Sequence, residues 1–243
     1  MSLDNKSTVS LFRNVFILVA FYGACFAIFL LFEYINSNQL IFSEGNFLNW
    51  DAAHYQSIVL NGYDESSVAF FPLFPLIWWG LSAGVILMCI LNGLFYILAF
   101  SWIAKEFLIS TRLLLLLSSV PGMIFMFLPY SEAMFFITSA MILIGYKREN
   151  FLLTILGVFL AGLSRPVATI FFPAIVIVDY LHNRKISLKT GVMLLICLLS
   201  LIVVFSIQHY ETGKWLSFFD SQKRRSEEHT SELQSPYVIS YAV

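Results

Sequence analysis

The segment NWDAAHYQSIVLNGY (residues 49–63) places a carboxylate and an imidazole among aromatic side chains. Asp51 and His54 are three residues apart, so a helix would bring them to one face. A carboxylate in this setting can act as a general base, and Trp50 can stack on the C–H face of a sugar. His54 can bind a phosphate or orient Asp51, and a structural hydrogen bond explains it equally well.

Two simpler roles compete with this chemistry. Residue type alone favours Asp51 as the N-cap of a short helix. Gly62 is expected to end that helix, and Tyr63, the aromatic residue after it, is a further candidate substrate contact. Asp51 and His54 could bind a divalent cation, but no third ligand is evident, so the sequence indicates no metal and no other cofactor.

Two more charged residues stand at the ends of apolar segments. Glu132, in LPYSEAMFF, opens an apolar run, where the helix dipole or a cap at Ser131 accounts for it. An ionisable residue at a membrane edge is also a functional candidate. Arg165, in GLSRPVA, needs an anion, which is either a protein acid such as Glu132 or the phosphate of a lipid or substrate. Gln222, in TGKWLSFFDSQK, follows the last apolar segment.

The composition shows what must position these residues. Of the 243 residues, 59% are hydrophobic and 12% are charged, and Phe occurs 25 times. A soluble domain carries roughly 25% charged residues, so the expected solvent is a bilayer and membrane lipids are expected partners. The three cysteines lie within apolar runs, which gives no disulfide framework. The net charge of −1 indicates no partner, and no nucleic acid is predicted.

The apolar runs predict an all-α, polytopic bundle of about seven membrane segments. These segments cover residues 14–35, 84–104, 113–129, 133–146, 151–164, 166–181 and 191–208. Several are shorter than the roughly 20 residues of a straight span, so the runs from 113 to 181 can also be longer helices broken at Pro129 and Pro166. Residues 69–82, with two prolines and two tryptophans, are expected to be re-entrant or interfacial, with Trp78 and Trp79 at the headgroup level.

The distribution of cations predicts the orientation of the chain. The large first loop, residues 36–68, contains no Lys or Arg. Basic residues instead lie before the first predicted segment and after the second, fourth and sixth. The positive-inside rule then places the N-terminus in the cytoplasm and this loop outside. Every candidate residue above collects on the same, non-cytoplasmic side.

The C-terminal residues, 225–243, differ from the apolar runs before them in composition. The stretch RSEEHTSELQS, within 225–243, can be back-translated into a common sequencing adapter. We therefore expect 225–243 to be a non-native tail, and residues 1–224 to be part of a membrane domain whose natural sequence continues.

Together, NWDAAHYQSIVLNGY with AFFPLFPL, PYSEAMFF, GLSRPVA and TGKWLSFFDSQ resemble the motifs of the PIG-V family over residues 12–224. PIG-V proteins are the second mannosyltransferases of GPI-anchor assembly and their bacterial relatives, within the GT-C glycosyltransferases. The resemblance implies a polyprenyl- or dolichyl-phosphate mannose donor, a glycan or glycolipid acceptor, and Asp51 as the catalytic acid of the first outer loop. It implies a location in a bacterial plasma membrane, or in the endoplasmic reticulum membrane of a eukaryote.

Two other classes of protein remain as alternatives. A transporter or flippase for a lipid-linked or small polar solute should carry ionisable residues near the middle of the membrane on broken helices. Here they gather at the outer edge, which favours an enzyme. A structural membrane subunit would carry the same residues without using them together.

Overall fold

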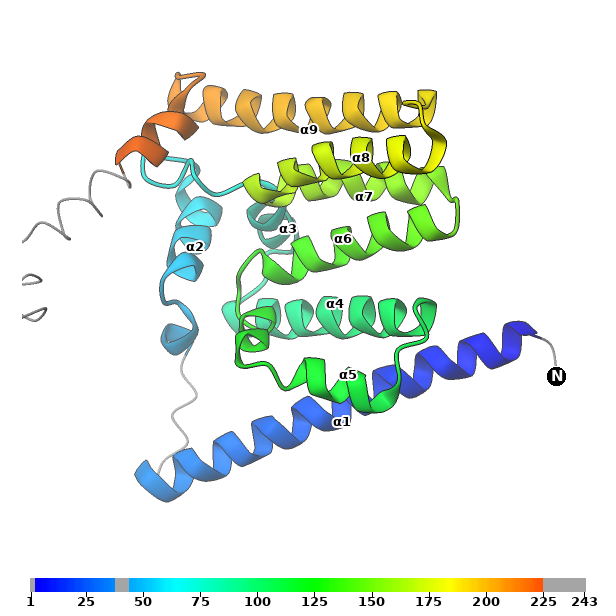
Figure 1. The fold of residues 1–243 in the computed structure, drawn as a ribbon. Coiled ribbons are helices and arrows are strands. Elements are labelled where there is room, and N and C mark those ends of the chain that lie inside the picture. The colour runs from blue at the N-terminus through cyan, green and yellow to red at the C-terminus, as the bar shows by residue number, and fades with distance from the viewer. Residues whose placement is uncertain (1–2, 38–43, 225–243) are drawn as a thin grey trace, which may run out of the picture.

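The computed structural model describes residues 3–37 and 44–224, and its regular elements are helices (Figure 1). The predicted all-α class is confirmed for this part of the chain. Residues 38–43 of the first loop and the predicted tail, 225–243, lie outside the described residues. The elements are α1 (Leu3–Ser37), η1 (Glu44–Phe47), α2 (Asp51–Asn61), α3 (Leu73–Leu81), α4 (Val85–Glu106), α5 (Thr111–Ser118), η2 (Pro121–Met126), α6 (Glu132–Lys147), α7 (Phe151–Ser164), η3 (Pro166–Ile170), α8 (Phe171–Asn183) and α9 (Leu188–Thr212).

Three helices in the described residues are long and apolar enough to cross a membrane. They are Ser10–Asn36 within α1, α4 and α9, with 27, 22 and 25 residues. These helices make the chain a candidate multi-pass membrane protein by length and composition. The predicted segments at 151–164 and 166–181 form apolar helices of 10–17 residues, shorter than the roughly 20 of a straight span.

Proline lies at three interruptions of the apolar runs. The predicted segment 113–129 divides into α5, which ends at Ser118, and η2, which begins at Pro121. A second interruption, between Met126 and Glu132, contains Pro129, where a break was predicted. Pro166 begins η3 and separates α7 from α8, at the predicted position. Proline has no N–H and a fixed φ, so it starts a helical turn more readily than it continues one.

The segment 69–82 contains a regular helix, α3, of nine residues. Trp78 is 2% exposed, and its indole N–H donates a hydrogen bond to the Ala83 carbonyl at 2.8 Å. The Trp78 ring therefore packs inside the protein, and the depth of both tryptophans in a bilayer stays a prediction. Trp79 is 67% exposed and remains free to meet lipid.

Small residues let three helices of the bundle approach closely. A Cβ on Gly157 of α7 would lie 2.9 Å from the backbone nitrogen of Ile142 in α6. A Cβ on Gly162 of α7 would overlap the hydroxyl of Ser200 in α9. Close approach through small residues is typical of helix packing in membranes. The packing fixes α7 between its two neighbours and sets where its C-terminal end lies.

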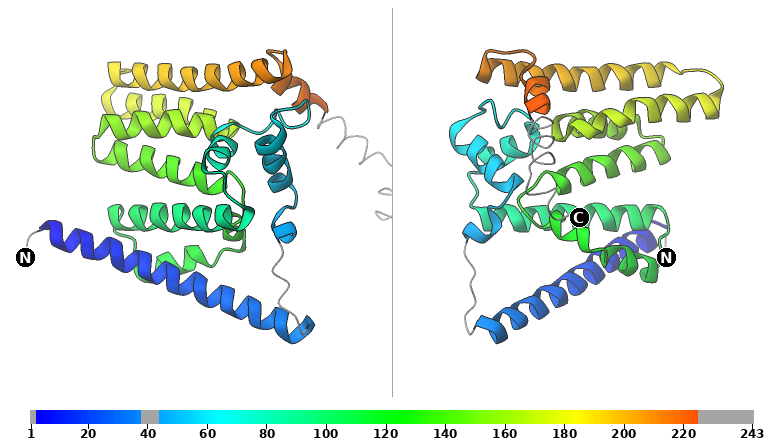
Figure 2. Two further views of the ribbon diagram at one scale, coloured as in Figure 1. Left: turned by 180° about the vertical axis from the view of Figure 1, so that it is seen from behind. Right: turned by 60° about the vertical axis from the view of Figure 1, so that its left-hand side comes forward.

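Several functional candidates come to one end of this bundle. Helices α4 and α6 begin at the end where α7 and α9 finish, and α2 stands across that end (Figures 1 and 2). The opposite end carries Lys105, Lys147 and Arg148, and Arg148 forms a 2.5 Å ion pair with Glu106. The two ends of the bundle thus differ in charge as the loop composition indicated.

Helix α1 runs obliquely, and its C-terminal half diverges from the other helices (Figures 1 and 2). Its N-terminal half is attached to the bundle through Leu18, which is fully buried, and Tyr22. The Tyr22 hydroxyl lies 2.9 Å from the Tyr96 hydroxyl and donates to the Ser118 carbonyl at 3.0 Å. Most side chains after Tyr22 in α1 are exposed.

Candidate functional site

The first turn of α2 carries Asp51, which is partly buried. The N-cap position is Trp50, and no side-chain capping hydrogen bond forms at it within the described residues. The alternative role of Asp51 as an N-cap is therefore not what the structure shows. Ala52 and Tyr55 are buried, so α2 packs against the rest of the protein through the face that carries them.

Trp50 has an unusual backbone conformation, with φ of 50° and ψ of −123°. A positive φ is readily adopted by glycine and costs a bulky residue about 1–3 kcal/mol. The side chain of Trp50 is 75% exposed next to Asp51. Strained residues of this kind concentrate at functional sites, so Trp50 remains a candidate contact for a ligand.

Two tyrosine hydroxyls connect the start of α2 to the start of α6. The hydroxyl of Tyr55 donates to Ser131 Oγ at 2.7 Å, and that of Tyr130 donates to the Asn49 carbonyl at 3.1 Å. Asn92, from within α4, donates its side-chain amide to the Leu128 and Tyr130 carbonyls at 2.5 and 2.9 Å. These bonds hold the segment before Glu132 against α2.

Glu132 and Arg165 form an ion pair of 2.5 Å between Oε1 and Nη1. Their side chains are 24% and 32% exposed, so the pair is only partly accessible to solvent. Of the two alternatives for Arg165, the protein acid is the partner seen here. The second carboxylate oxygen, Oε2, is buried and has no hydrogen-bond partner among the described residues.

Asp51 belongs to the same electrostatic environment as this ion pair. Burial raises the pKa of Tyr130, and the nearby carboxylates of Asp51 and Glu132 raise it further. Burial lowers the pKa of Arg165, but Glu132, Tyr55 and Asp51 raise it more, so the net shift is upward. Asp51, Glu132 and Arg165, from α2, α6 and the end of α7, therefore lie close enough to act on the same groups electrostatically.

The remaining candidates divide into those near this cluster and one that is separate. The imidazole of His54 stacks on the Phe70 ring with centroids 4.9 Å apart and planes at 23°. Tyr63 packs against the same apolar cluster as Tyr55, and burial raises its pKa, with Tyr55 and Glu211 adding to the shift. Gln222 is exposed in the helical stretch 217–224, and no hydrogen bond or ion pair joins it to Asp51 within the described part of the chain.

The supporting residues were harder to find from the sequence. The sequence motifs predict Ser131 only as a cap and indicate no role for Tyr55 or Asn92. The sequence does contain a signal for Asn92, because a lone amide in an otherwise apolar helix must find a hydrogen-bond partner. Its partners, carbonyls 36 and 38 residues away, depend on tertiary packing.

The carboxylate of Asp51 and the cation of Arg165 are groups that can take part in acid–base chemistry. Within residues 3–37 and 44–224, no three His, Cys, Asp or Glu side chains are grouped to hold a metal ion. The Asp51 carboxylate forms no hydrogen bond or ion pair with another described residue, so it can accept a proton from a ligand. No protein-family model, curated protein or solved structure matches this chain.

Proposed function

We propose that this chain is part of a membrane glycosyltransferase that moves a sugar from a polyprenyl- or dolichyl-phosphate donor to a hydroxyl group of a glycan or glycolipid. The sugar is mannose by resemblance to the PIG-V family. The observation that carries the proposal is the hydrogen bond from Tyr55 to Ser131, which joins the helix of Asp51 to the helix that carries Glu132 and its ion pair with Arg165.

In the proposed reaction, Asp51 is the general base. It takes the proton of the acceptor hydroxyl as that oxygen attacks the anomeric carbon of the donor. The bond between the anomeric carbon and the phosphate oxygen breaks, and the phosphate leaves with the electron pair. Attack from the opposite side inverts the sugar centre. A lipid phosphate is already a good leaving group, so the reaction needs no strong general acid.

Arg165 is proposed to stabilise the charge that develops on the leaving phosphate. A guanidinium has five N–H donors, and the ion pair with Glu132 uses the one nitrogen Nη1. Arg165 can therefore keep its bond to Glu132 and still bind a phosphate. Glu132 would act as a positioning residue, while His54, Trp50 and Tyr63 line the approach.

The proposed setting is the non-cytoplasmic face of a bacterial plasma membrane, or the lumenal face of the endoplasmic reticulum. Seven membrane segments would place the first loop, α2 and the start of α6 on that face. A transporter is less well supported, because α4, α6 and α7 contain no Asp, Glu, Lys, Arg or His in their middle turns.

The test is Asp51→Asn in membranes that contain the natural full-length protein. Loss of the base should lower transfer from a labelled polyprenyl-phosphate sugar by about 10²–10⁴-fold, without loss of membrane insertion. Glu149→Gln, at an exposed acid of the opposite end, is the control and should transfer at the normal rate. Undiminished transfer by Asp51→Asn would remove Asp51 from the base role, and solute flux without any transfer would favour a transporter.

A further inference from the structure

The carbonyl of Asn49 joins the first turn of α2 to the segment before α6. It accepts a hydrogen bond from the Tyr130 hydroxyl at 3.1 Å and a second one from the backbone amide of Ala52 at 3.2 Å. The Ala52 bond closes a tight turn whose two central residues are Trp50 and Asp51. Rotation of the peptide between Asn49 and Trp50 would break both bonds, so the orientation of this peptide determines the placement of Asp51.

The conformation of this turn is unfavourable for the residue that occupies it. The φ and ψ of Trp50, 50° and −123°, correspond to the first central position of a type II′ turn. Glycine is the usual residue at that position, because a side chain there crowds the backbone. The turn therefore needs support from outside, and the Tyr130 hydroxyl, which comes from a distant part of the chain, is placed to give it.

Tyr130 is itself held firmly. It is 4% exposed, and its carbonyl accepts a hydrogen bond from the side-chain amide of Asn92 at 2.9 Å. Its ring stacks on that of Phe125, with centroids 5.9 Å apart and planes at 19°. Burial raises the pKa of Tyr130 and the Asp51 carboxylate raises it further, so the hydroxyl and the carboxylate are close in space. A hydroxyl that is fixed in this way can impose a conformation on the turn.

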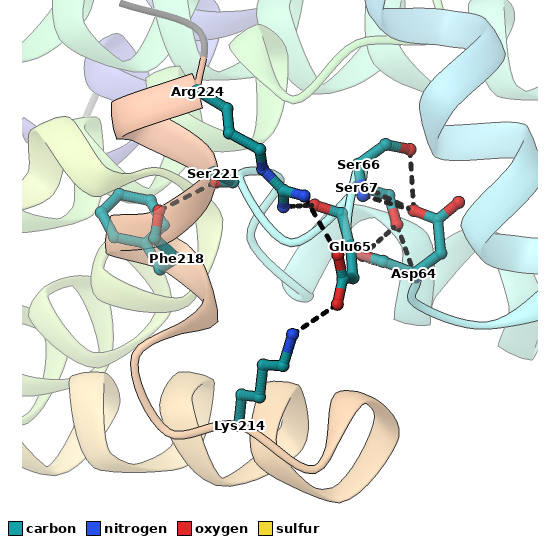
Figure 3. A network of polar contacts seen from close by, with 8 residues as sticks. All are labelled: Asp64, Glu65, Ser66, Ser67, Lys214, Phe218, Ser221 and Arg224. Carbon is teal, nitrogen blue, oxygen red and sulfur yellow. Dashed lines mark hydrogen bonds and ion pairs between the residues drawn. The ribbon is translucent and has the colours of Figure 1, made fainter.

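The other end of α2 is held by contacts that do not involve Tyr130. In the loop that follows α2, Glu65 pairs with Lys214 Nζ at 2.5 Å and with Arg224 Nη1 at 3.0 Å (Figure 3). The side chain of Gln208 in α9 donates a hydrogen bond to the Val68 carbonyl at 2.7 Å. Loss of the Tyr130 bond should therefore free the first turn of α2 and leave the rest of the helix in place.

We propose that Tyr130 is a positioning residue for Asp51. Its hydroxyl holds the Asn49 carbonyl, keeps Trp50 in its strained conformation and so places the Asp51 carboxylate at the acceptor hydroxyl. This inference rests on the proposed function, in which Asp51 is the general base. The hydrogen bond and the strain are of similar magnitude, so without the bond Trp50 relaxes and carries Asp51 with it. Transfer is sensitive to displacements of about 1 Å between reacting groups.

The experiment compares Tyr130→Phe in two backgrounds of the natural full-length protein, one with Trp50 and one with Trp50→Gly. With Trp50, the substitution should lower kcat by about tenfold or more and leave the KM for a labelled polyprenyl-phosphate sugar unchanged, because Arg165 is not displaced. With Trp50→Gly, it should lower kcat by no more than about twofold, because glycine keeps the turn without strain. Tyr146→Phe, at a tyrosine of α6 that is 42% exposed, is the matched control and should leave kcat unchanged.

Hydrogen exchange gives a measurement that does not need activity. Tyr130→Phe should speed exchange of the Ala52 amide, which closes the turn, in the Trp50 protein but not in the Trp50→Gly protein, and exchange in α9 should stay the same. An equal fold-loss of kcat in the two backgrounds, or unchanged exchange at Ala52 in the Trp50 protein, would overturn the proposal. Faster exchange throughout α9 would make Tyr130 a support of the whole fold and would also overturn it. An absence of sugar transfer by the wild type would overturn the proposed function instead, and exchange at Ala52 would still decide whether Tyr130 holds the turn.

Discussion

At the scale of single residues, the site is held by hydroxyl groups rather than by its charged members. Tyr55 and Ser131 are both buried and are 76 positions apart in the chain. Their hydrogen bond connects α2, which carries Asp51, to α6, which carries Glu132. The position of the base relative to the ion pair therefore depends on a neutral contact.

Tyr55→Phe should destabilise the protein by about 1 kcal/mol or more, because the buried Ser131 hydroxyl loses its partner. The measurement is the unfolding midpoint in detergent, together with the rate of sugar transfer. Tyr210→Phe, at a tyrosine that is 87% exposed, is the matched control and should leave both unchanged. Equal midpoints for the two variants would mean that the Tyr55 bond contributes nothing measurable.

At the scale of elements, the position of α7 decides where Arg165 lies. Gly162, in the last turn of α7, faces Ser200 of α9 at a distance that leaves no room for a side chain. The Ser200 hydroxyl donates to the Cys197 carbonyl at 2.7 Å and cannot turn away without losing that bond. This contact sets the spacing of the two helices near the site.

Gly162→Ala should lower the free energy of unfolding by about 1–3 kcal/mol, as overpacking of a close contact does. Gly191→Ala provides the control, because nothing lies within 4 Å of a Cβ there. Alanine favours a helix over glycine by about 1 kcal/mol, so this variant should be neutral or more stable. A loss of stability for Gly191→Ala as large as that for Gly162→Ala would contradict the packing argument.

The turn at residues 64–67 should respond to acid. Hydrogen bonds from Ser67, and then from Ser66, lower the pKa of Asp64 from 3.8 to about 2. A lowered native pKa stabilises the folded state above pH 3.8, and this contribution is lost as the pH falls through 2. Asp64→Asn should therefore melt below the wild type at pH 6, and the two should converge near pH 2. A gap that stays constant over this range would show that the charge of Asp64 is not the cause.

Local features of the elements followed from the sequence, and contacts between them did not. Gly62 ends α2 with φ of 80°, as expected from its type, and Pro166 separates α7 from α8. The break at Pro129, between η2 and α6, was also predicted, whereas the additional one at Pro121, which satisfies the same local rule, was not. Burial of Trp78 could not be foreseen, since it requires the Ala83 carbonyl to lie against the indole. The sequence predicted only that Asp51 and Arg165 lie on the same side of the membrane, and it did not predict their electrostatic interaction.

At the scale of the whole molecule, the two ends of the bundle are chemically different. One end carries α2 and the Glu132–Arg165 pair, and the other carries Lys105, Lys147 and Arg148. If the basic end is cytoplasmic, the proposed catalytic site faces outward.

Single cysteines in a background without Cys25, Cys89 and Cys197 can test this orientation. Ser66→Cys should react with an impermeant maleimide added outside intact cells, whereas Lys185→Cys should react only after the membrane is opened. Both positions are exposed, so accessibility to the reagent is comparable. Labelling of both residues from outside, or of Lys185→Cys alone, would reject the proposed topology.

The oblique course of α1 has a consequence for the behaviour of the protein in different bilayers. Its apolar stretch of 27 residues is about 40 Å long, against a hydrocarbon layer of about 30 Å. The excess length requires tilt, and the mainly exposed C-terminal half leaves room for the angle to vary. A thicker, sterol-rich bilayer would let α1 stand more upright around its attachment at Leu18 and Tyr22. Because α2 follows α1 in the chain, the thickness of the bilayer would then alter the distance between the C-terminal end of α1 and α2.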